Sequence, residues 1–280
     1  VPGHPSQLPV GNERYGIPAA WPGCMQPDPD LLTQQEHITD RVTTTFTDRW
    51  NAALSVIAPT MKPVKDAFRV HGERVLYNSL KPYHAIGRLE HLPAHHHFIG
   101  PLIRDEALAE PYRHWLDQVD ERPLVYVALG TFLSHRADVL SKISEALQQA
   151  GVRVAMAIGA NPVSVFEPLP QGWLIEPSLP QVGLLRGCDL IIHHGGNNSV
   201  QEALGLGVHQ IILPFSTDQF ANAADLERTG QATVISPNHI CPSALAEVIA
   251  TIVALSKPKK VMPLNPTLLA SALNRPKHTI

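Results

Sequence analysis

The 280-residue chain has few cysteines, little excess charge and no long apolar run. Its three cysteines, Cys24, Cys188 and Cys241, lie far apart and form no CxxC pair, so neither a disulfide framework nor a cysteine-bound metal is expected. A formal net charge of −3 lacks the basic field that broad nucleic-acid binding requires. No run approaches the roughly 20 apolar residues that span a bilayer, and the first residues do not resemble a secretory signal. We therefore expect a cytoplasmic protein that binds no nucleic acid and does not span a membrane.

The apolar content that is present is sufficient for a sizeable core. Hydrophobic residues make up 44% of the chain, which is typical of a globular protein with one large or two ordinary domains. In the first part, apolar residues recur every three or four positions over 31–68 and predict a helix. A short strand over 74–79 and a proline-bounded extended stretch over 93–103 follow. We place a domain boundary here, which divides the chain into 1–104 and 105–280.

Strands and helices alternate in the second part of the chain. Apolar strands are predicted over 124–130, 152–159, 173–177, 188–194, 208–214 and 232–236. Helices or helical turns are predicted over 137–150, 182–186, 199–206, 219–229 and 242–255. Apolar strands that alternate with helices are typical of an α/β fold, with a parallel sheet covered on both faces. Ligands of such sheets bind beyond the carboxyl ends of the strands, so the loops that follow the strands are the candidate site.

The loop after the fourth of these strands is rich in hydrogen-bonding groups. His193 and His194 are followed by two glycines, two asparagines and a serine. Gly196 and its neighbour allow close backbone approach, and Asn198 or Ser199 can cap the next helix. The first amides of that helix then favour an anion, to which His194 adds a donor. An ordinary tight turn uses the same residue types, and a metal site fits less well because neighbouring strand residues point to opposite faces.

Polar residues near two further helix starts each allow two interpretations. Glu202 can form a capping box with Ser199, or it can accept hydrogen bonds from a ribose. Asp218 and Gln219 suit a polyol, because sugar hydroxyls both donate and accept, although Asp218 can also cap the following helix. Asn222 can extend this polar rim, but we expect it to be a solvated helix residue.

Two other stretches are candidates with weaker signals. Gly130 and Thr131 end the first strand of the second part, where they either offer an amide and a hydroxyl to the same edge or simply terminate the strand. We include both among the donor-site candidates. The run 95-HHH-97 resembles a metal-binding tract in composition, but it has no acidic partner nearby. We expect a solvated loop there and no metal site.

Taken in chain order, these loops and the helix starts that follow them resemble the C-terminal half of the family 1 glycosyltransferases. This is the UDP-glycosyltransferase superfamily with the GT-B fold. The matching residues are 180-PQ-181, the leucine pair at 184–185, 193-HHGGNNSVQEALGLGV-208, Pro214 and 218-DQ-219. The HHGG start is similar to bacterial members that glycosylate natural products. The resemblance implies a Rossmann-like, parallel-sheet C-terminal domain that binds a nucleotide sugar, and a partial N-terminal domain on the acceptor side.

The resemblance also implies roles for individual residues, all of them in donor binding. The implied diphosphate contacts are Thr131, His194, Asn198 and Ser199; the backbone contacts are Gly196 and Asn197; the ribose contact is Glu202; the sugar contacts are Asp218 and Gln219; and the residues beside the base are Leu179 and Gln181. No metal ion is implied, because backbone amides and His194 take its part in holding the diphosphate.

Two features depart from the family pattern. Plant members place a tryptophan two residues before the PQ proline, where this chain has Ser178, and Trp173 falls in a predicted strand. The first residues also lack the opening strand, the glycine-rich turn and the base histidine of the family. The resemblance thus implies that the first part of the N-terminal domain is absent from this chain, and no catalytic residue is assigned.

The implied reaction is the inverting transfer of a sugar from a UDP- or TDP-sugar to a hydroxyl of a small-molecule acceptor, without a cofactor. The activity of this chain alone stays open. So do two alternatives: a non-catalytic nucleotide-sugar-binding subunit that needs a partner chain, and a GT-B-fold sugar-nucleotide epimerase. A homodimer, or a partner chain that supplies the missing part, is compatible with the resemblance.

Overall fold

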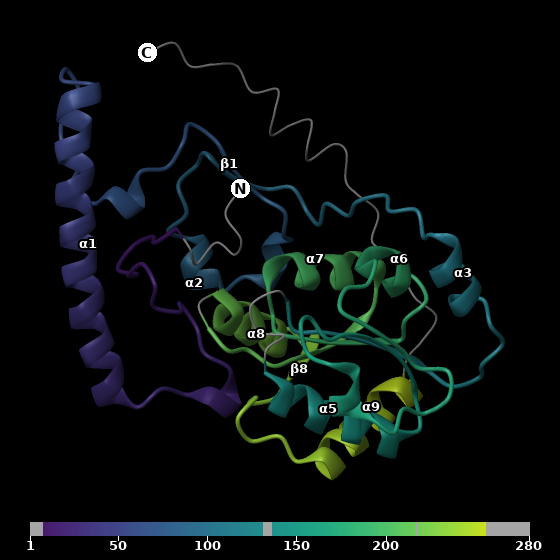
Figure 1. The fold of residues 1–280 in the computed structure, drawn as a ribbon. Coiled ribbons are helices and arrows are strands. Elements are labelled where there is room, and N and C mark those ends of the chain that lie inside the picture. The colour runs from purple at the N-terminus through teal and green to yellow at the C-terminus, as the bar shows by residue number, and fades with distance from the viewer. Residues whose placement is uncertain (1–7, 131–135, 217, 256–280) are drawn as a thin grey trace.

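A computed structural model describes residues 8–130, 136–216 and 218–255. Its main feature is a six-stranded parallel sheet in the order β5-β4-β3-β6-β7-β8 (Figure 1). The strands are β3 (Leu124–Ala128), β4 (Arg153–Ala157), β5 (Leu174–Glu176), β6 (Leu190–His193), β7 (His209–Ile212) and β8 (Ala232–Val234). Counted along the chain, this is the 3-2-1-4-5-6 order of a doubly wound dinucleotide-binding fold, which reverses direction between β3 and β6.

Helices cover both faces of this sheet. α5 (Ala137–Ala150) and α9 (Pro242–Leu255) pack on one face, and α6 (Gln181–Leu185) and α7 (Asn197–Leu206) pack on the other (Figure 1). α8 (Asp218–Arg228) packs against α7 and β8. The predicted α/β fold is therefore confirmed.

The side chains of β3 show why its sequence is apolar throughout. Val125 and Val127 belong to the cluster that includes α5 and α9, whereas Tyr126 and Ala128 belong to the cluster that includes α6 and α7. Successive strand residues point to opposite faces, and both faces of this strand are buried. An alternating pattern would therefore be wrong for this sheet.

The predicted helix ends are correct where glycine or proline marks them. α5 and α9 have the predicted bounds, and α5 ends at Gly151, which has a φ of +66°. α7 begins at Asn197, two residues before the predicted start, and α8 begins at Asp218, one residue early.

The first part of the chain contains one long helix, α1 (Pro29–Ile57), beside the sheet domain (Figure 1). The Asp28 carboxylate accepts hydrogen bonds from the amides of Asp30 and Leu31 and so caps the helix start. The predicted end at residue 68 is wrong, because Pro59 cannot continue a helix. The apolar face of α1 remains partly exposed, and Phe46 stacks on Phe68 beyond the helix end.

A second, smaller sheet follows α1. Its strands β1 (Val75–Tyr77) and β2 (His96–Phe98) pair in parallel, and α2 (Ile86–Leu89) lies between them in the chain. Soon after the predicted boundary comes α3 (Glu110–Leu116), whose apolar side chains pack on the cluster that includes α6. The position of the boundary near residue 104 stays a prediction. None of the helices in the described ranges is both long enough and apolar enough to cross a membrane.

Candidate functional site

The point where the strand order reverses lies between β3 and β6, and two predicted donor-site residues lie directly beyond it. Gly130 follows β3, with a φ of +75°, and His194 follows β6. Ala128 and His193, near the ends of the two strands, are paired in the parallel ladder. This topological switch point is where doubly wound sheets hold their ligands.

The His194 ring is held between two glycines. A Cβ atom added at Gly130 would lie 2.7 Å from Cε1 of His194, and one added at Gly196 would lie 2.5 Å from its Nε2. Only residues without a Cβ therefore fit on both sides of this ring. Burial lowers the pKa of His194 below the usual histidine value, against the effect of a hydrogen bond to the Ala128 backbone, so the ring is mainly neutral at pH 7 and carries one N–H. Its Nε2 side faces Gly196, at the start of α7.

The start of α7 offers backbone donors. The N-cap residue is Gly196, without a side-chain cap, so the prediction that Asn198 or Ser199 caps this helix is wrong. The Gly196 carbonyl accepts from the amide of Val200. Within the described residues, no acceptor is found for the amides of residues 196–199. The β6–α7 corner, residues 194–199, is thus able to donate several N–H groups to an anion beside His194.

Glu202 and Gln181 form a polar pair at the edge of this corner. The Gln181 amide nitrogen donates to Oε2 of Glu202 at 2.6 Å and to the hydroxyl of Ser199 at 3.1 Å. A capping box requires Ser199 to be the N-cap of the helix. Since Gly196 is the N-cap of α7, Ser199 and Glu202 do not form a capping box, and that interpretation is wrong. Burial raises the pKa of Glu202, against the effect of the Gln181 hydrogen bond. Its carboxylate is half-buried, and accepting hydroxyl hydrogen bonds would stabilise it.

The neighbouring corner, before α8, lies against this one. A Cβ atom added at Gly195, where φ is +89°, would lie 2.9 Å from Ile212 and 3.3 Å from the carbonyl oxygen of Gln219. The Asn222 side chain donates to the Gly195 carbonyl at 2.8 Å and is only 2% exposed. The prediction that Asn222 is a solvated helix residue is therefore wrong, because it joins the two corners.

The predicted sugar-binding pair differs in its surroundings. Asp218 is the first residue of α8 and half-buried, and its charge is one of the influences on the pKa of His194. Gln219 is buried, and its side-chain oxygen accepts from the amides of Phe215 and Ser216. In this structure the Gln219 side chain thus orders the loop before α8.

The remaining predicted residues lie around the same edge, with one exception. Leu179 is half-buried just before α6, and Asn198 is exposed. The Asn197 side chain donates to Asn78, after β1, at 2.8 Å, which leaves its backbone for the predicted contact. Thr131 lies outside the described residues. Sequence reasoning missed Asn78, since nothing local links residues 119 positions apart.

Comparisons with known proteins agree with this geometry. Residues 141–265 match the model of the erythromycin biosynthesis protein CIII-like C-terminal domain. The second part of the chain is therefore similar to bacterial glycosyltransferases of natural-product biosynthesis.

Two curated relatives illustrate the similarity. An uncharacterized UDP-glucosyltransferase of Bacillus subtilis (strain 168), YojK, is 27% identical over 153 residues, which are 54% of this chain and 37% of the relative. The demethyllactenocin mycarosyltransferase of Streptomyces fradiae is 25% identical over 241 residues, which are 85% of this chain and 49% of the relative. The chain thus spans less than half the length of either relative.

Solved structures show the same GT-B fold. The spinosyn rhamnosyltransferase SpnG, solved in complex with thymidine diphosphate, superimposes with a TM-score of 0.56 at 20% sequence identity. The superposition covers 75% of this chain and 52% of SpnG. The predicted GT-B fold class is confirmed.

Trp173 packs into the core, beside β5. Its indole N–H donates to the Val152 carbonyl at 3.1 Å, and its ring packs on the cluster that includes α5 and α9. Ser178, at the position where plant members have the stacking tryptophan, is exposed. Trp173 therefore does not replace that tryptophan.

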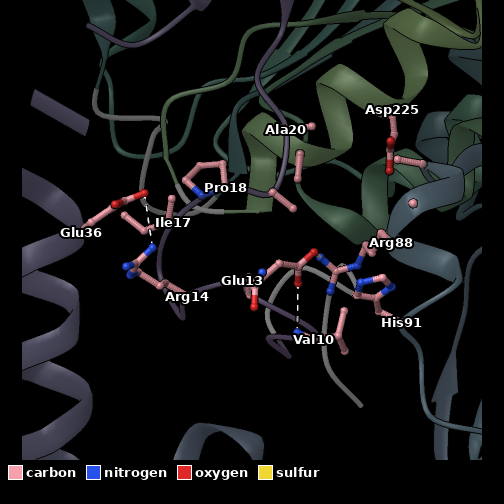
Figure 2. A pocket seen from close by; sticks show the side chains of 15 residues that line it. Val10, Glu13, Arg14, Ile17, Pro18, Ala20, Glu36, Arg88, His91 and Asp225 are labelled. Atoms are coloured by element: carbon pink, nitrogen blue, oxygen red, sulfur yellow. Dashed lines mark hydrogen bonds and ion pairs between the residues drawn. The ribbon is translucent and has the colours of Figure 1, made fainter. Parts of the chain in front are cut away.

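A pocket lies between the N-terminal segment and α8 (Figure 2). None of the eleven predicted donor residues in the described ranges lines it, but Ala221 does, one turn along α8 from Asp218. In its wall, the Arg88 guanidinium donates to a Glu13 carboxylate oxygen at 2.7 Å. The pocket thus belongs to the segment that the family resemblance places on the acceptor side, and it lies outside the donor corner.

A serine, a histidine and an aspartate are joined across the two parts of the chain. His84 Nε2 lies 2.9 Å from the Ser79 hydroxyl, and His84 Nδ1 lies 3.2 Å from Oδ2 of Asp225, in α8. The order resembles that of a hydrolase triad. The three residues are 2%, 4% and 6% exposed, however, so a substrate carbonyl cannot reach Ser79 in this structure. The chain of hydrogen bonds connects α8 with the segment after β1.

The histidine run at 95–97 is not the solvated loop that the sequence predicts. His96 and His97 lie in β2, and His96 is only 8% exposed. His95 and His96 lie close to His71, with one ring nitrogen from each within 4.8 Å of the others. Burial lowers the pKa of His96 to about 4, and it also lowers the pKa of His71. The expectation of a solvated loop was therefore wrong.

Proposed function

We propose that this chain carries the donor half of an inverting glycosyltransferase, and that its β6–α7 corner binds the diphosphate of a UDP- or TDP-sugar. The main support for this proposal is that His194 and the amides at the start of α7 lie together at the switch point of the sheet. Oriented N–H donors and the helix dipole favour an anion there. The relatives named as glycosyltransferases, and a GT-B structure with thymidine diphosphate, support the same ligand.

In the whole protein, the donor sugar transfers to a hydroxyl of a small-molecule acceptor. A base on the acceptor side takes the hydroxyl proton, the acceptor oxygen attacks the anomeric carbon from the face opposite the leaving group, and the nucleoside diphosphate departs. The amides at the start of α7 and His194 stabilise the charge that develops on the diphosphate. The nucleotide sugar acts as a substrate, and no step requires a cofactor or a metal ion.

The other donor residues take the parts that the family resemblance gives them. Glu202 accepts hydrogen bonds from the ribose, and Asp218 and Gln219 hold the transferred sugar. The widely spaced cysteines suit a reducing cytoplasm. Assembly as a homodimer, or with a partner chain, is part of this proposal. Neither a binding subunit without activity nor an epimerase is favoured by the relatives, which are named as glycosyltransferases.

Calorimetric titration with UDP, TDP and uridine tests the proposal. We expect UDP or TDP to bind with a stoichiometry near one, and uridine to bind at least about tenfold more weakly, because it lacks the charged group that the corner recognises. If neither diphosphate binds, or if uridine binds as tightly as UDP, the proposed diphosphate site is wrong.

Glu202 provides a second prediction that separates ribose from diphosphate. A Glu202→Ala variant is expected to lose about 1.5–3 kcal/mol of the binding free energy of the preferred nucleotide, since a hydrogen-bonded carboxylate is removed. Its affinity for inorganic pyrophosphate, which has no ribose, should not change. Glu247→Ala, on the exposed side of α9, is the matched control. Equal losses for nucleotide and pyrophosphate would contradict the ribose role.

A further inference from the structure

Three histidines from separate parts of the first domain converge at one point. His71 lies in the segment before β1, His95 in the turn before β2, and His96 is the first residue of β2. The parallel pairing of β1 with β2 brings them together, because the amide of Val75 donates to the His95 carbonyl. Nδ1 of His71 lies 3.0 Å from Nε2 of His96. One nitrogen from each of the three rings lies within 4.8 Å of the other two.

A hydrogen bond to Tyr77 fixes the orientation of the His96 ring. Its Nδ1 lies 2.8 Å from the hydroxyl of Tyr77, a residue with no exposed surface. This bond holds the ring so that Nε2 points toward His71. Histidines that bind metal ions in proteins characteristically bond their second ring nitrogen in this way, which sets the tautomer and the ring plane.

The two ring nitrogens of His71 have different surroundings. Its Nε2 is buried, and no hydrogen-bond partner for it is found in the described part of the chain. A buried polar atom without a partner costs free energy. Nδ1 of this ring faces Nε2 of His96 across a 3.0 Å hydrogen bond, which a metal ion bound by both nitrogens would replace, and Nε2 lies on the other side of the ring.

We propose that His71, His95 and His96 bind a divalent transition-metal ion, with Zn²⁺ as the best match. Imidazole nitrogens suit zinc, copper, nickel and iron, and three histidines with one open position are a common zinc arrangement. Zn–N bonds of about 2.0–2.1 Å place tetrahedral ligands roughly 3.4 Å apart. The His71–His96 pair already lies near this spacing. The widest separation closes by a rotation of His95, which is half-buried in a turn.

The site also has a side that is open to exchangeable ligands. A pocket reaches His71 and His95, and its other lining residues are Pro9, Val10, Gly11, Arg69, His91 and Pro93. No carboxylate is among these lining residues, so the three imidazoles leave the charge of the ion uncompensated. The fourth position, on the pocket side, would therefore take water or a small anion.

Metal titration of the chelator-stripped protein tests this site. We expect about one equivalent of Zn²⁺ to bind, as measured by competition with a chromogenic chelator. Co²⁺ at the same site should give the intense visible absorption bands of tetrahedral coordination. The His71→Ala and His95→Ala variants should each bind at least about tenfold more weakly, whereas His37→Ala, on the exposed surface of α1, should bind as the unaltered protein does.

Two results would overturn the proposal. One is the absence of binding at micromolar Zn²⁺ by a protein whose circular dichroism shows that it is folded. The other is an unchanged affinity in both His71→Ala and His95→Ala, which would place the ion elsewhere. The test is independent of the nucleotide site, because UDP binding and Zn²⁺ binding are measured separately.

Discussion

Gly196→Ala is expected to weaken binding of the preferred nucleoside diphosphate by about 10- to 100-fold, the loss that accompanies one hydrogen bond to a charged group. The added Cβ would lie 2.5 Å from Nε2 of His194, so the ring must move away from the start of α7. The proposed diphosphate then loses the imidazole donor while the backbone amides stay in place. Calorimetric titration with UDP and TDP measures the effect.

A double-mutant cycle shows whether the loss acts through His194. His194→Ala should weaken binding to a similar extent, and the double variant should bind no worse than His194→Ala alone, because the ring is already gone. Gly87→Ala, in α2, is the matched control, since its added Cβ would meet no atom within 4 Å. Additive losses in the double variant would show that the methyl group blocks the ligand directly. If His194→Ala binds with full affinity, the His194 imidazole does not contribute to ligand binding.

The sequence predicts this sheet well because its signals are local. Apolar strands that alternate with helices determine the α/β class, and Gly151 and Pro242 mark the end of α5 and the start of α9. The order of the strands depends on which strands pair, and no single segment carries that information. α1 was predicted too long because the periodic apolar pattern outweighed Pro59.

The candidate site was predictable in place but only partly in detail. Glycines and polar residues after the strands point to the correct edge, because parallel strands all end there. The N-cap was misplaced because Asn198 and Ser199 are better caps than glycine in isolation. In the folded chain, Asn222 bonds the Gly195 carbonyl, and the N-cap is Gly196, two residues before Asn198.

The histidine cluster shows the same limit more sharply. The run at 95–97 is visible in the sequence, but His71 is not adjacent to it. The cluster also contains no acidic residue, whose absence near the run led us to predict a solvated loop. The convergence requires β1 and β2 to pair in parallel. Long-range pairing of this kind is decided by tertiary packing rather than by local pattern.

Asp225→Ala is expected to lower the free energy of unfolding by about 1.5–3 kcal/mol, because the carboxylate acceptor of a buried hydrogen bond is removed. The Asp225 carboxylate is 6% exposed and accepts at 3.2 Å from Nδ1 of His84, which is itself 4% exposed. Without the carboxylate, a buried ring nitrogen has no acceptor there. Asp225→Asn keeps an oxygen that can accept, so it should lose less. Urea denaturation followed by circular dichroism measures all three proteins.

The control and the contrary outcome follow from where this bond lies. Asp48→Ala changes an exposed carboxylate in the middle of α1 and should alter stability by no more than about 0.5 kcal/mol. The His84–Asp225 bond joins residues 141 positions apart, so it connects the segment after β1 with the helix that begins at Asp218. If the two parts unfold together, Asp225→Ala shifts a single transition. If Asp225→Ala is as stable as Asp48→Ala, the buried bond does not hold the two parts together.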